Sequence, residues 1–129
     1  MKQNFLDAAW RCIQAAADGD AEATANLPLF MPGLEEGALE RNLTAAYYAA
    51  HLYDLGLGVE QNRARAFALV TWVNRHPGPQ PDHRFGTIMK DWFVCWDREI
   101  VGAERERALQ FLEQFVRTRD AGPCVTSHR

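Results

Sequence analysis

The segment from Thr44 to Arg75 decides the fold of this chain and reads TAAYYAAHLYDLGLGVEQNRARAFALVTWVNR. Two runs with helical periodicity lie on either side of the turn Gly56-Leu57-Gly58. Small side chains would let the two helices approach closely, and larger apolar side chains would fill the space between them. The small residues are Ala45, Ala46, Ala49, Ala50, Ala64, Ala66 and Ala68, and the large ones are Tyr47, Leu52, Phe67, Val70 and Val73. The segment therefore predicts a helix–turn–helix unit.

This unit resembles a Sel1-like repeat, a relative of the tetratricopeptide repeat. The usual pattern of that family is a helix of small residues, a Leu-Tyr-x-x-Gly-x-Gly-Val turn, and a second helix with an alanine three residues before a tryptophan or phenylalanine. The stretch from Leu52 to Asn62, followed by Ala66, matches the turn and the alanine of this pattern. The matching unit, Thr44 to Arg75, covers roughly a quarter of the chain. The resemblance implies an α-solenoid-type protein-binding module with no catalytic residues common to the family.

Periodic apolar residues predict helices before this unit as well. The run from Leu6 to Ala17 forms the stripe of an amphipathic helix, with Asn4 as its N-cap and Gly19 as its stop. Asp20 is expected to cap a short helix after that glycine. The segment from Pro28 to Gly37 holds two prolines and two glycines and is expected to interrupt this helix as a loop.

The remaining helices are predicted from the same periodicity. A helix is expected from Leu39 to about Leu55, and Asn62 is expected to cap the next one. The prolines from His76 to Pro81 predict an extended connector. Two further helices are predicted at Phe85 to Trp96 and at Ala103 to Thr118. The predicted fold is all-α, with about six helices in antiparallel hairpins that form a Sel1-like or tetratricopeptide-like superhelix.

Length and composition predict a single domain. The chain has 129 residues, of which 47% are apolar, enough for one core. We expect residues 1–119 to form this helical-repeat domain and residues 120–129 to be a flexible tail without periodicity. No apolar run reaches the roughly 18 residues of a membrane span, and the start of the chain does not resemble a signal peptide. Three cysteines without close spacing, at positions 12, 95 and 124, favour reduced thiols and a cytoplasmic protein.

Charge is distributed unevenly along the chain. Residues 1–62 contain nine acidic and three basic residues, a net charge of −6, whereas residues 63–129 contain eleven basic and eight acidic residues, a net charge of +3. The isoelectric point of about 5.8 argues against a nucleic-acid partner, because such proteins usually carry a basic patch. The acidic first half instead favours a basic protein partner.

The candidate residues for catalysis, metal binding and nucleotide binding have simpler structural explanations. His51 and Asp54 are three residues apart, a spacing that lets a carboxylate orient an imidazole for base catalysis, but a helix-surface pair is the favoured interpretation. Cys95 is interpreted as a buried or half-buried free thiol that behaves as a small hydrophobe. The four histidines form no zinc motif, and the Gly-x-Gly turn lacks the third glycine of a nucleotide-binding loop. No catalytic residue, metal or cofactor is therefore predicted.

We instead predict a non-catalytic protein-binding module. The favoured role is a small inhibitor or immunity-type protein that binds and blocks a cognate toxin or enzyme, with its acidic half against a basic active site. One alternative is a Sel1-like adaptor or scaffold for a peptide or protein, and another is a small hydrolase using His51 and Asp54. The aromatic residues Trp92, Trp96, Phe85 and Phe93 are expected in the core, because they lie on one helical stripe, and a ligand-binding groove is the alternative. The predicted partner-binding residues are Glu35, Glu36, Glu40, Tyr48, His51 and Asp54.

Overall fold

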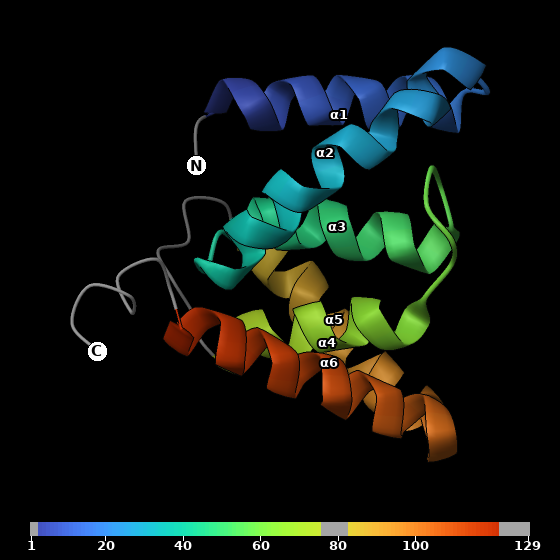
Figure 1. Cartoon of the computed structure of the whole chain (residues 1–129). Coiled ribbons are helices and arrows are strands. Elements are labelled where there is room, and N and C mark those ends of the chain that lie inside the picture. The colour runs from blue at the N-terminus through green and yellow to red at the C-terminus, as the bar shows by residue number, and fades with distance from the viewer. Residues whose placement is uncertain (1–2, 76–82, 122–129) are drawn as a thin grey trace.

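The computed structural model describes residues 3–75 and 83–121, and this part of the chain contains six helices and no strand. The all-α prediction is thereby confirmed. The helices are α1 (Gln3–Ala17), α2 (Ala21–Leu39), α3 (Leu43–Leu55), α4 (Arg63–Arg75), α5 (His83–Glu99) and α6 (Gly102–Ala121) (Figure 1). The predicted connector from His76 to Pro81 and residues 122–129 of the predicted tail lie outside the described residues.

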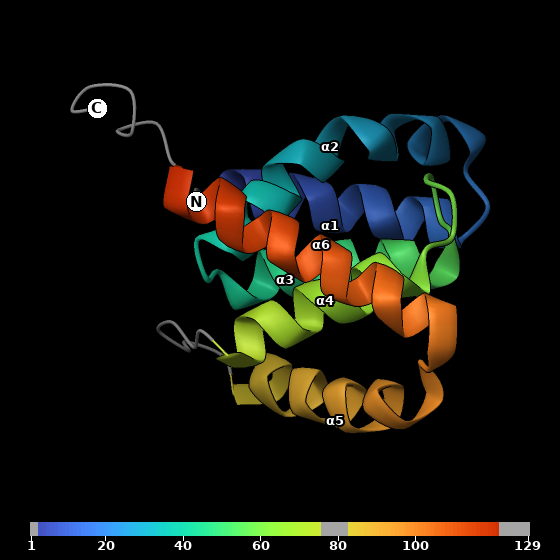
Figure 2. The same cartoon turned by 60° about the horizontal axis from the view of Figure 1, so that its bottom comes forward.

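The helices are arranged in two series, as in helical-repeat proteins. Helices α1, α2, α3 and α4 each pack against the next, and the pairs α1–α2 and α3–α4 run in opposite directions (Figure 1). Helices two apart in sequence also touch, so α1, α3 and α5 form one series and α2, α4 and α6 form the other. Helices α5 and α6 lie on either side of α4 and both pack against it (Figure 2). Helix α4 is therefore the central helix.

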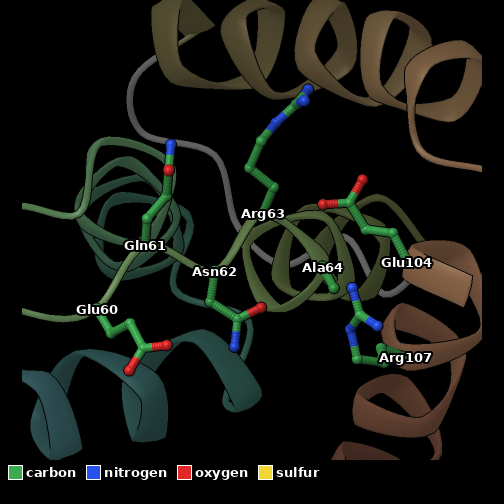
Figure 3. Close-up of a pocket in the computed structure, with 7 residues that line it drawn as sticks. All are labelled: Glu60, Gln61, Asn62, Arg63, Ala64, Glu104 and Arg107. Carbon is green, nitrogen blue, oxygen red and sulfur yellow. The ribbon is translucent and has the colours of Figure 1, made fainter.

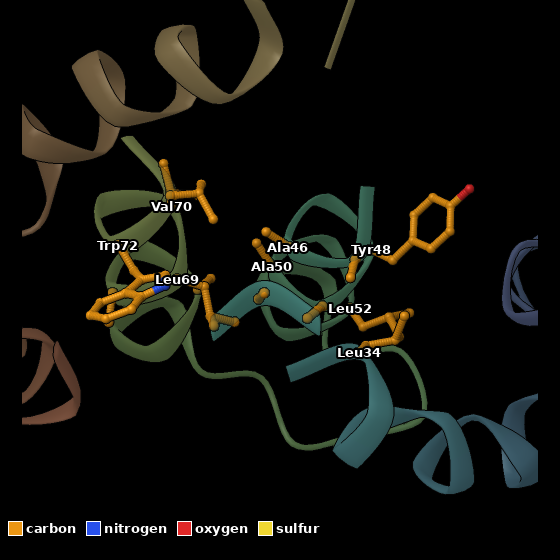
Figure 4. Close-up of a cluster of buried hydrophobic side chains, with 14 of the residues drawn as sticks. Leu34, Ala46, Tyr48, Ala50, Leu52, Leu69, Val70 and Trp72 are labelled. Carbon is orange, nitrogen blue, oxygen red and sulfur yellow. The ribbon is translucent and has the colours of Figure 1, made fainter. Parts of the chain in front are cut away.

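The core lies mainly between α2, α3 and α4. Leu34, Leu52 and Leu69 come from these three helices and are fully buried there (Figure 4). The alanines of α3 and α4 are buried as well, which lets the two helices approach closely. Helix α4 is buried on most of its surface, as predicted from its apolar residues, because neighbours cover it on several sides.

The glycine turn between α3 and α4 has the conformation that its sequence predicts. Gly56 adopts a left-handed conformation with φ of 68°, and its N–H donates to the carbonyl of Leu52 at 2.8 Å. Gly58 has φ of 74°, and a Cβ atom there would lie 2.5 Å from the Cβ of Leu27 in α2. The second glycine is therefore required by backbone conformation and by the close approach of α2. Asn62 caps α4 as predicted, since its Oδ1 accepts from the N–H of Arg65 at 3.0 Å.

The loop predicted at Pro28 to Gly37 is wrong, because α2 continues through both prolines. A proline inside a helix removes one hydrogen bond and usually kinks or ends the helix. Pro28 and Pro32 lie one turn apart on the exposed side of α2, where water can satisfy the carbonyl groups that they leave without a donor. The opposite side buries Leu27, Met31 and Leu34 in the core. This burial stabilises a helix that the local sequence disfavours.

Two predicted helix starts also differ from the structure. The helix expected from Leu39 starts at Leu43, because α2 occupies the residues up to Leu39. Asn42 is the N-cap of α3, and its Oδ1 accepts from the N–H of Ala45 at 3.0 Å. Asn4 lies inside α1 and is not its N-cap. Asp20 does cap α2, as its Oδ1 accepts from the N–H of Ala23 at 2.9 Å.

The two predicted C-terminal helices are confirmed with longer bounds. Helix α5 contains the predicted run from Phe85 to Trp96, and α6 contains the run from Ala103 to Thr118. Helix α6 continues to Ala121. Among the described residues, none of the helices combines the length and the hydropathy that crossing a membrane requires.

Candidate partner-binding surface

A continuous series of aromatic rings crosses the odd-numbered helices. Trp10 of α1 stacks on Tyr48 of α3, with ring centroids 5.2 Å apart. Tyr47 of α3 stacks on Trp92 of α5, also at 5.2 Å, and Trp92 stacks on Trp96 at the same distance. We call this series the ring strip, and its members are Trp10, Tyr47, Tyr48, His51, Trp92 and Trp96.

The spacing of these residues explains why their rings meet. Tyr47 and His51 are four residues apart on α3, as are Trp92 and Trp96 on α5, so each pair lies on one face of its helix. The Tyr47 and His51 rings stack at 5.8 Å, and the His51 ring lies nearly parallel to that of Trp92 at 6.2 Å. The sequence shows the pairs within each helix. Only the packing of α1, α3 and α5 aligns them into one strip.

The ring strip is anchored in the core and open to solvent. Tyr48 and Trp96 are 8% and 6% exposed, so they fix the strip to the hydrophobic core. Trp10, Tyr47, His51 and Trp92 are only partly buried. Partly exposed rings with fixed orientations are well suited to protein recognition, because they offer a large contact area at a low cost in conformational entropy.

The environment of the ring strip is neutral to acidic. Burial lowers the pKa of His51 below its ordinary value of 6.5, and the opposing effect of Asp54 is smaller, so the ring is mostly neutral at pH 7. Burial and the nearby charge of Asp7 raise the pKa of the Tyr48 hydroxyl. The strip thus carries no charge of its own at neutral pH, and Asp7 and Asp54 are its charged neighbours.

Asp54 is engaged by an arginine instead of forming a hydrogen-bonded pair with His51. Its Oδ1 lies 3.8 Å from Nε of Arg63, whose Nη2 also donates to Oε1 of Glu99 at 2.8 Å. Among the described residues, no hydrogen bond joins Asp54 to His51, and the His51 ring stacks on its aromatic neighbours. Asp54 therefore influences His51 through its charge alone.

Glu35, predicted as a partner-binding residue, is occupied within the fold. Its carboxylate accepts two hydrogen bonds from Arg65, one of them from Nη2 at 2.9 Å, and a third from the Tyr53 hydroxyl at 3.0 Å. The guanidinium of Arg65 also lies over the rings of Phe111 and Phe115, at 4.9 and 5.2 Å from their centroids. We call Glu35, Tyr53, Arg65, Phe111 and Phe115 the ionic clasp. It joins α2, α3, α4 and α6.

The ionic clasp shifts the ionisation of its own groups. Burial and the charge of Glu35 raise the pKa of Tyr53 to about 12, although Arg65 acts in the opposite direction. Burial by itself would lower the pKa of Arg65, but the hydrogen bonds and charge of Glu35 raise it overall. Both shifts move the pKa values further from neutral pH, so Arg65 stays charged and Tyr53 stays neutral over a wider range of pH than the free side chains would.

The structure separates the predicted partner-binding residues into three groups. Tyr48 and His51 belong to the ring strip, Asp54 borders it, and Glu35 belongs to the ionic clasp. Glu36 is exposed on α2 and Glu40 is its exposed C-cap residue, and no hydrogen bond or ion pair of the described residues joins either to the ring strip. Trp10 was not predicted as a binding residue, and for Trp92 the core was favoured over a ligand groove, because both lie on the apolar stripes of their helices. The four-residue spacing of Trp92 and Trp96 was the available signal.

A polar pocket of about 300 Å³ lies beside the glycine turn, where the N-terminal ends of α4 and α6 come together (Figure 3). Glu104 and Arg107 come from α6, and the other lining residues come from the turn and the first residues of α4. Two glutamates and two arginines line it, and Arg63 already pairs with Glu99. The formal charges of these four lining side chains cancel, so the pocket has no net charge that would favour an anion or a cation.

No group of three or more histidine, cysteine, aspartate or glutamate residues within residues 3–75 and 83–121 is arranged to hold a metal ion. Cys12 and Cys95 are free thiols, and Cys124 lies outside the described residues. Comparisons with protein-family models, with curated proteins and with solved structures found no match.

Proposed function

We propose that this chain is a non-catalytic protein-binding module whose binding surface is the ring strip. The observation that carries this proposal is the alignment of four partly exposed rings, Trp10, Tyr47, His51 and Trp92, across three successive odd-numbered helices. Aromatic residues dominate the binding energy of many protein interfaces. Helical repeats also bind partners along the surface formed by successive repeats. The resemblance of Thr44 to Arg75 to a Sel1-like repeat supports the same proposal.

The electrostatic surroundings favour a partner segment that combines apolar and basic side chains. Asp7 lies near Tyr48 of the strip, Asp54 borders it with its charge partly compensated by Arg63, and residues 1–62, which contribute α1 and α3 to the strip, carry a net charge of −6. Basic side chains at the edge of the interface would be attracted to these carboxylates, while apolar side chains cover the rings.

A more specific proposal concerns what this binding achieves. We propose an inhibitor or immunity-type protein of the cytoplasm, which covers the basic active site of a cognate toxin or enzyme. The odd number of cysteines supports a cytoplasmic location, and the acidic first half supports a basic partner surface. An inhibitor would abolish the activity of its partner at a one-to-one ratio, whereas an adaptor would leave that activity intact.

The proposal is tested by replacing the two exposed tryptophans one at a time. We expect Trp10→Ala and Trp92→Ala each to weaken binding at least about tenfold, because each removes a large contact area. The ligand in this test is a partner protein that copurifies with the full chain. Binding is measured by calorimetry with the purified full chain, and thermal unfolding confirms that each variant is folded. Phe30→Ala is the matched control, since Phe30 is a partly buried ring of α2 that contacts Phe5 outside the strip. Unchanged affinity in both folded tryptophan variants would show that another surface binds the partner.

A further inference from the structure

A second surface lies on a side of α5 different from the one that contributes to the ring strip. Trp92 faces α3, whereas the neighbouring Phe93 stacks on Phe67 of α4 with ring centroids 5.8 Å apart. On this side α4, α5 and α6 enclose a cavity of about 40 Å³, whose lining includes Phe67, Thr71, Phe93 and Leu109. Because a water molecule needs about 10–15 Å³ of such space, the cavity has room for about three waters or one short side chain.

The floor of this cavity contains a buried polar group without a partner. Thr71 is 4% exposed, and its Oγ1 makes no hydrogen bond in the described part of the chain. A buried threonine on a helix commonly bonds to the carbonyl one turn earlier, and one that bonds to nothing is unfavourable. A ligand that brings a hydroxyl or amide into the cavity would satisfy Thr71.

The mouth of the cavity is apolar on the α6 side. Leu109, which lines the cavity, is 51% exposed, and Val116 is 39% exposed two turns later on the same face of α6. Leu112 lies between them and also lines the cavity. Together these three side chains form an aliphatic edge that a partner would cover.

The two ends of the cavity differ in charge. At one end Arg105 of α6 donates from Nη2 to Oδ1 of Asp97 at 2.7 Å, so the two charges are paired. At the other end lies Arg75, which is exposed and makes no ion pair among the described contacts. Arg75 is two turns beyond Phe67 on α4, about 12 Å along the helix axis. The groove that α4, α5 and α6 form around this cavity therefore offers, among the described residues, a positive charge without an ion pair one turn beyond Thr71.

The packing of the other helices indicates which shape of partner fits the groove that α4, α5 and α6 form around this cavity. Helix α3 lies against α1 and α2, and α5 lies in the same way against α3 and α4. The surface that α5 and α6 form over α4 is the next position in this series. A helix is therefore the element whose dimensions match the groove.

We propose that this groove binds an acidic amphipathic α-helix of a partner protein. Apolar residues of that helix cover Leu109 and Val116, a short polar side chain enters the cavity and bonds to Thr71, and a carboxylate pairs with Arg75. This surface does not depend on the ring strip, so the proposal stands apart from the function proposed above.

The test uses designed helical peptides and methyl NMR of the full chain. The acidic probe carries leucines and one serine on one face and glutamates on the other, and its counterpart has lysines in place of the glutamates. We expect the acidic probe to shift the methyl signals of Thr71, Leu109 and Leu112 in a saturable manner, and the lysine probe not to do so. The proposal would be overturned by equal shifts of the methyl signals with both probes, or by shifts confined to the ring strip. It would also be overturned if these signals shifted with protein concentration in the absence of any probe.

Three variants sharpen the test. Leu109→Glu and Arg75→Glu are each expected to weaken binding of the acidic probe at least about tenfold, because one removes apolar contact and both add repulsion. Leu29→Glu is the matched control for the first, as Leu29 is an exposed leucine on α2, at 77% exposure. Thr71→Val is expected to raise the unfolding temperature while weakening binding, since valine needs no hydrogen bond. Undiminished binding in folded Leu109→Glu and Arg75→Glu would exclude the groove as the binding site.

Discussion

The ionic clasp and the ring strip both join helices across the fold with aromatic side chains, but they leave different surfaces behind. In the clasp the side chains of Glu35 and Arg65 are 19% and 21% exposed, and their charges and hydrogen bonds are used within the chain. In the ring strip no member is charged at neutral pH, and four rings keep part of their area exposed. The clasp therefore has few groups left for a partner, whereas the strip has area that a partner can still bury. An acidic residue is not a recognition residue merely because it is charged.

The largest change in the free energy of unfolding is expected from reversing the charge of Glu35 in the ionic clasp. Glu35→Lys would place an ammonium beside Arg65 and remove three hydrogen bonds, which should lower the free energy of unfolding by about 2–4 kcal/mol. Urea unfolding of the purified chain measures this change.

The adjacent residue provides the control for that experiment. Glu36 is exposed and has no ion pair among the described contacts, so Glu36→Lys should change the free energy of unfolding by no more than about 0.5 kcal/mol. Equal destabilisation by both variants would contradict the internal role assigned to Glu35.

A smaller effect on the free energy of unfolding is expected from the protonation of His51 in the ring strip. Because the pKa of His51 is lowered in the folded chain, the unfolded chain takes up a proton more readily as the pH falls below the ordinary value of 6.5. The contribution of His51 to stability is therefore fully present above that pH and is lost as the pH falls through the lowered pKa. Unfolding measured at a series of pH values should show a weaker acid dependence in His51→Gln than in the parent chain. The same acid dependence in both would mean that other groups are responsible.

The smallest effect on stability is expected for the exposed acidic residues at the C-terminal end of α2, Glu36 and its C-cap residue Glu40. The double variant Glu36→Lys and Glu40→Lys should leave thermal unfolding nearly unchanged, because neither side chain has an ion pair among the described contacts. If these residues help to attract a basic partner, the variant should slow association and reduce its dependence on salt. Stopped-flow measurement of the association rate decides this, and an unchanged rate would limit recognition to the ring strip.

Local sequence was a reliable guide where a residue acts on its own neighbours. Gly56 and Asn62 were predicted at their places in the turn because a left-handed conformation and an N-cap depend on a few adjacent residues. Local rules failed at Pro28 and Pro32, where burial of the opposite face of α2 outweighs the cost of two interrupted hydrogen bonds. The role of Glu35 within the fold could not be predicted from local sequence either, since its partner Arg65 is thirty residues away in the chain.

The sequence by itself determined that this protein is made of helices, where most of them lie, and how the turn at Gly56 and Gly58 joins α3 to α4. These features follow from the period of the apolar residues and from the conformational preferences of single residues. Only the tertiary structure decided which side chains meet between helices. It placed Glu35 inside the ionic clasp and left Trp10 and Trp92 partly exposed. The physical reason is that such contacts depend on how the helices cross and how closely they approach, which a pattern along one helix does not specify.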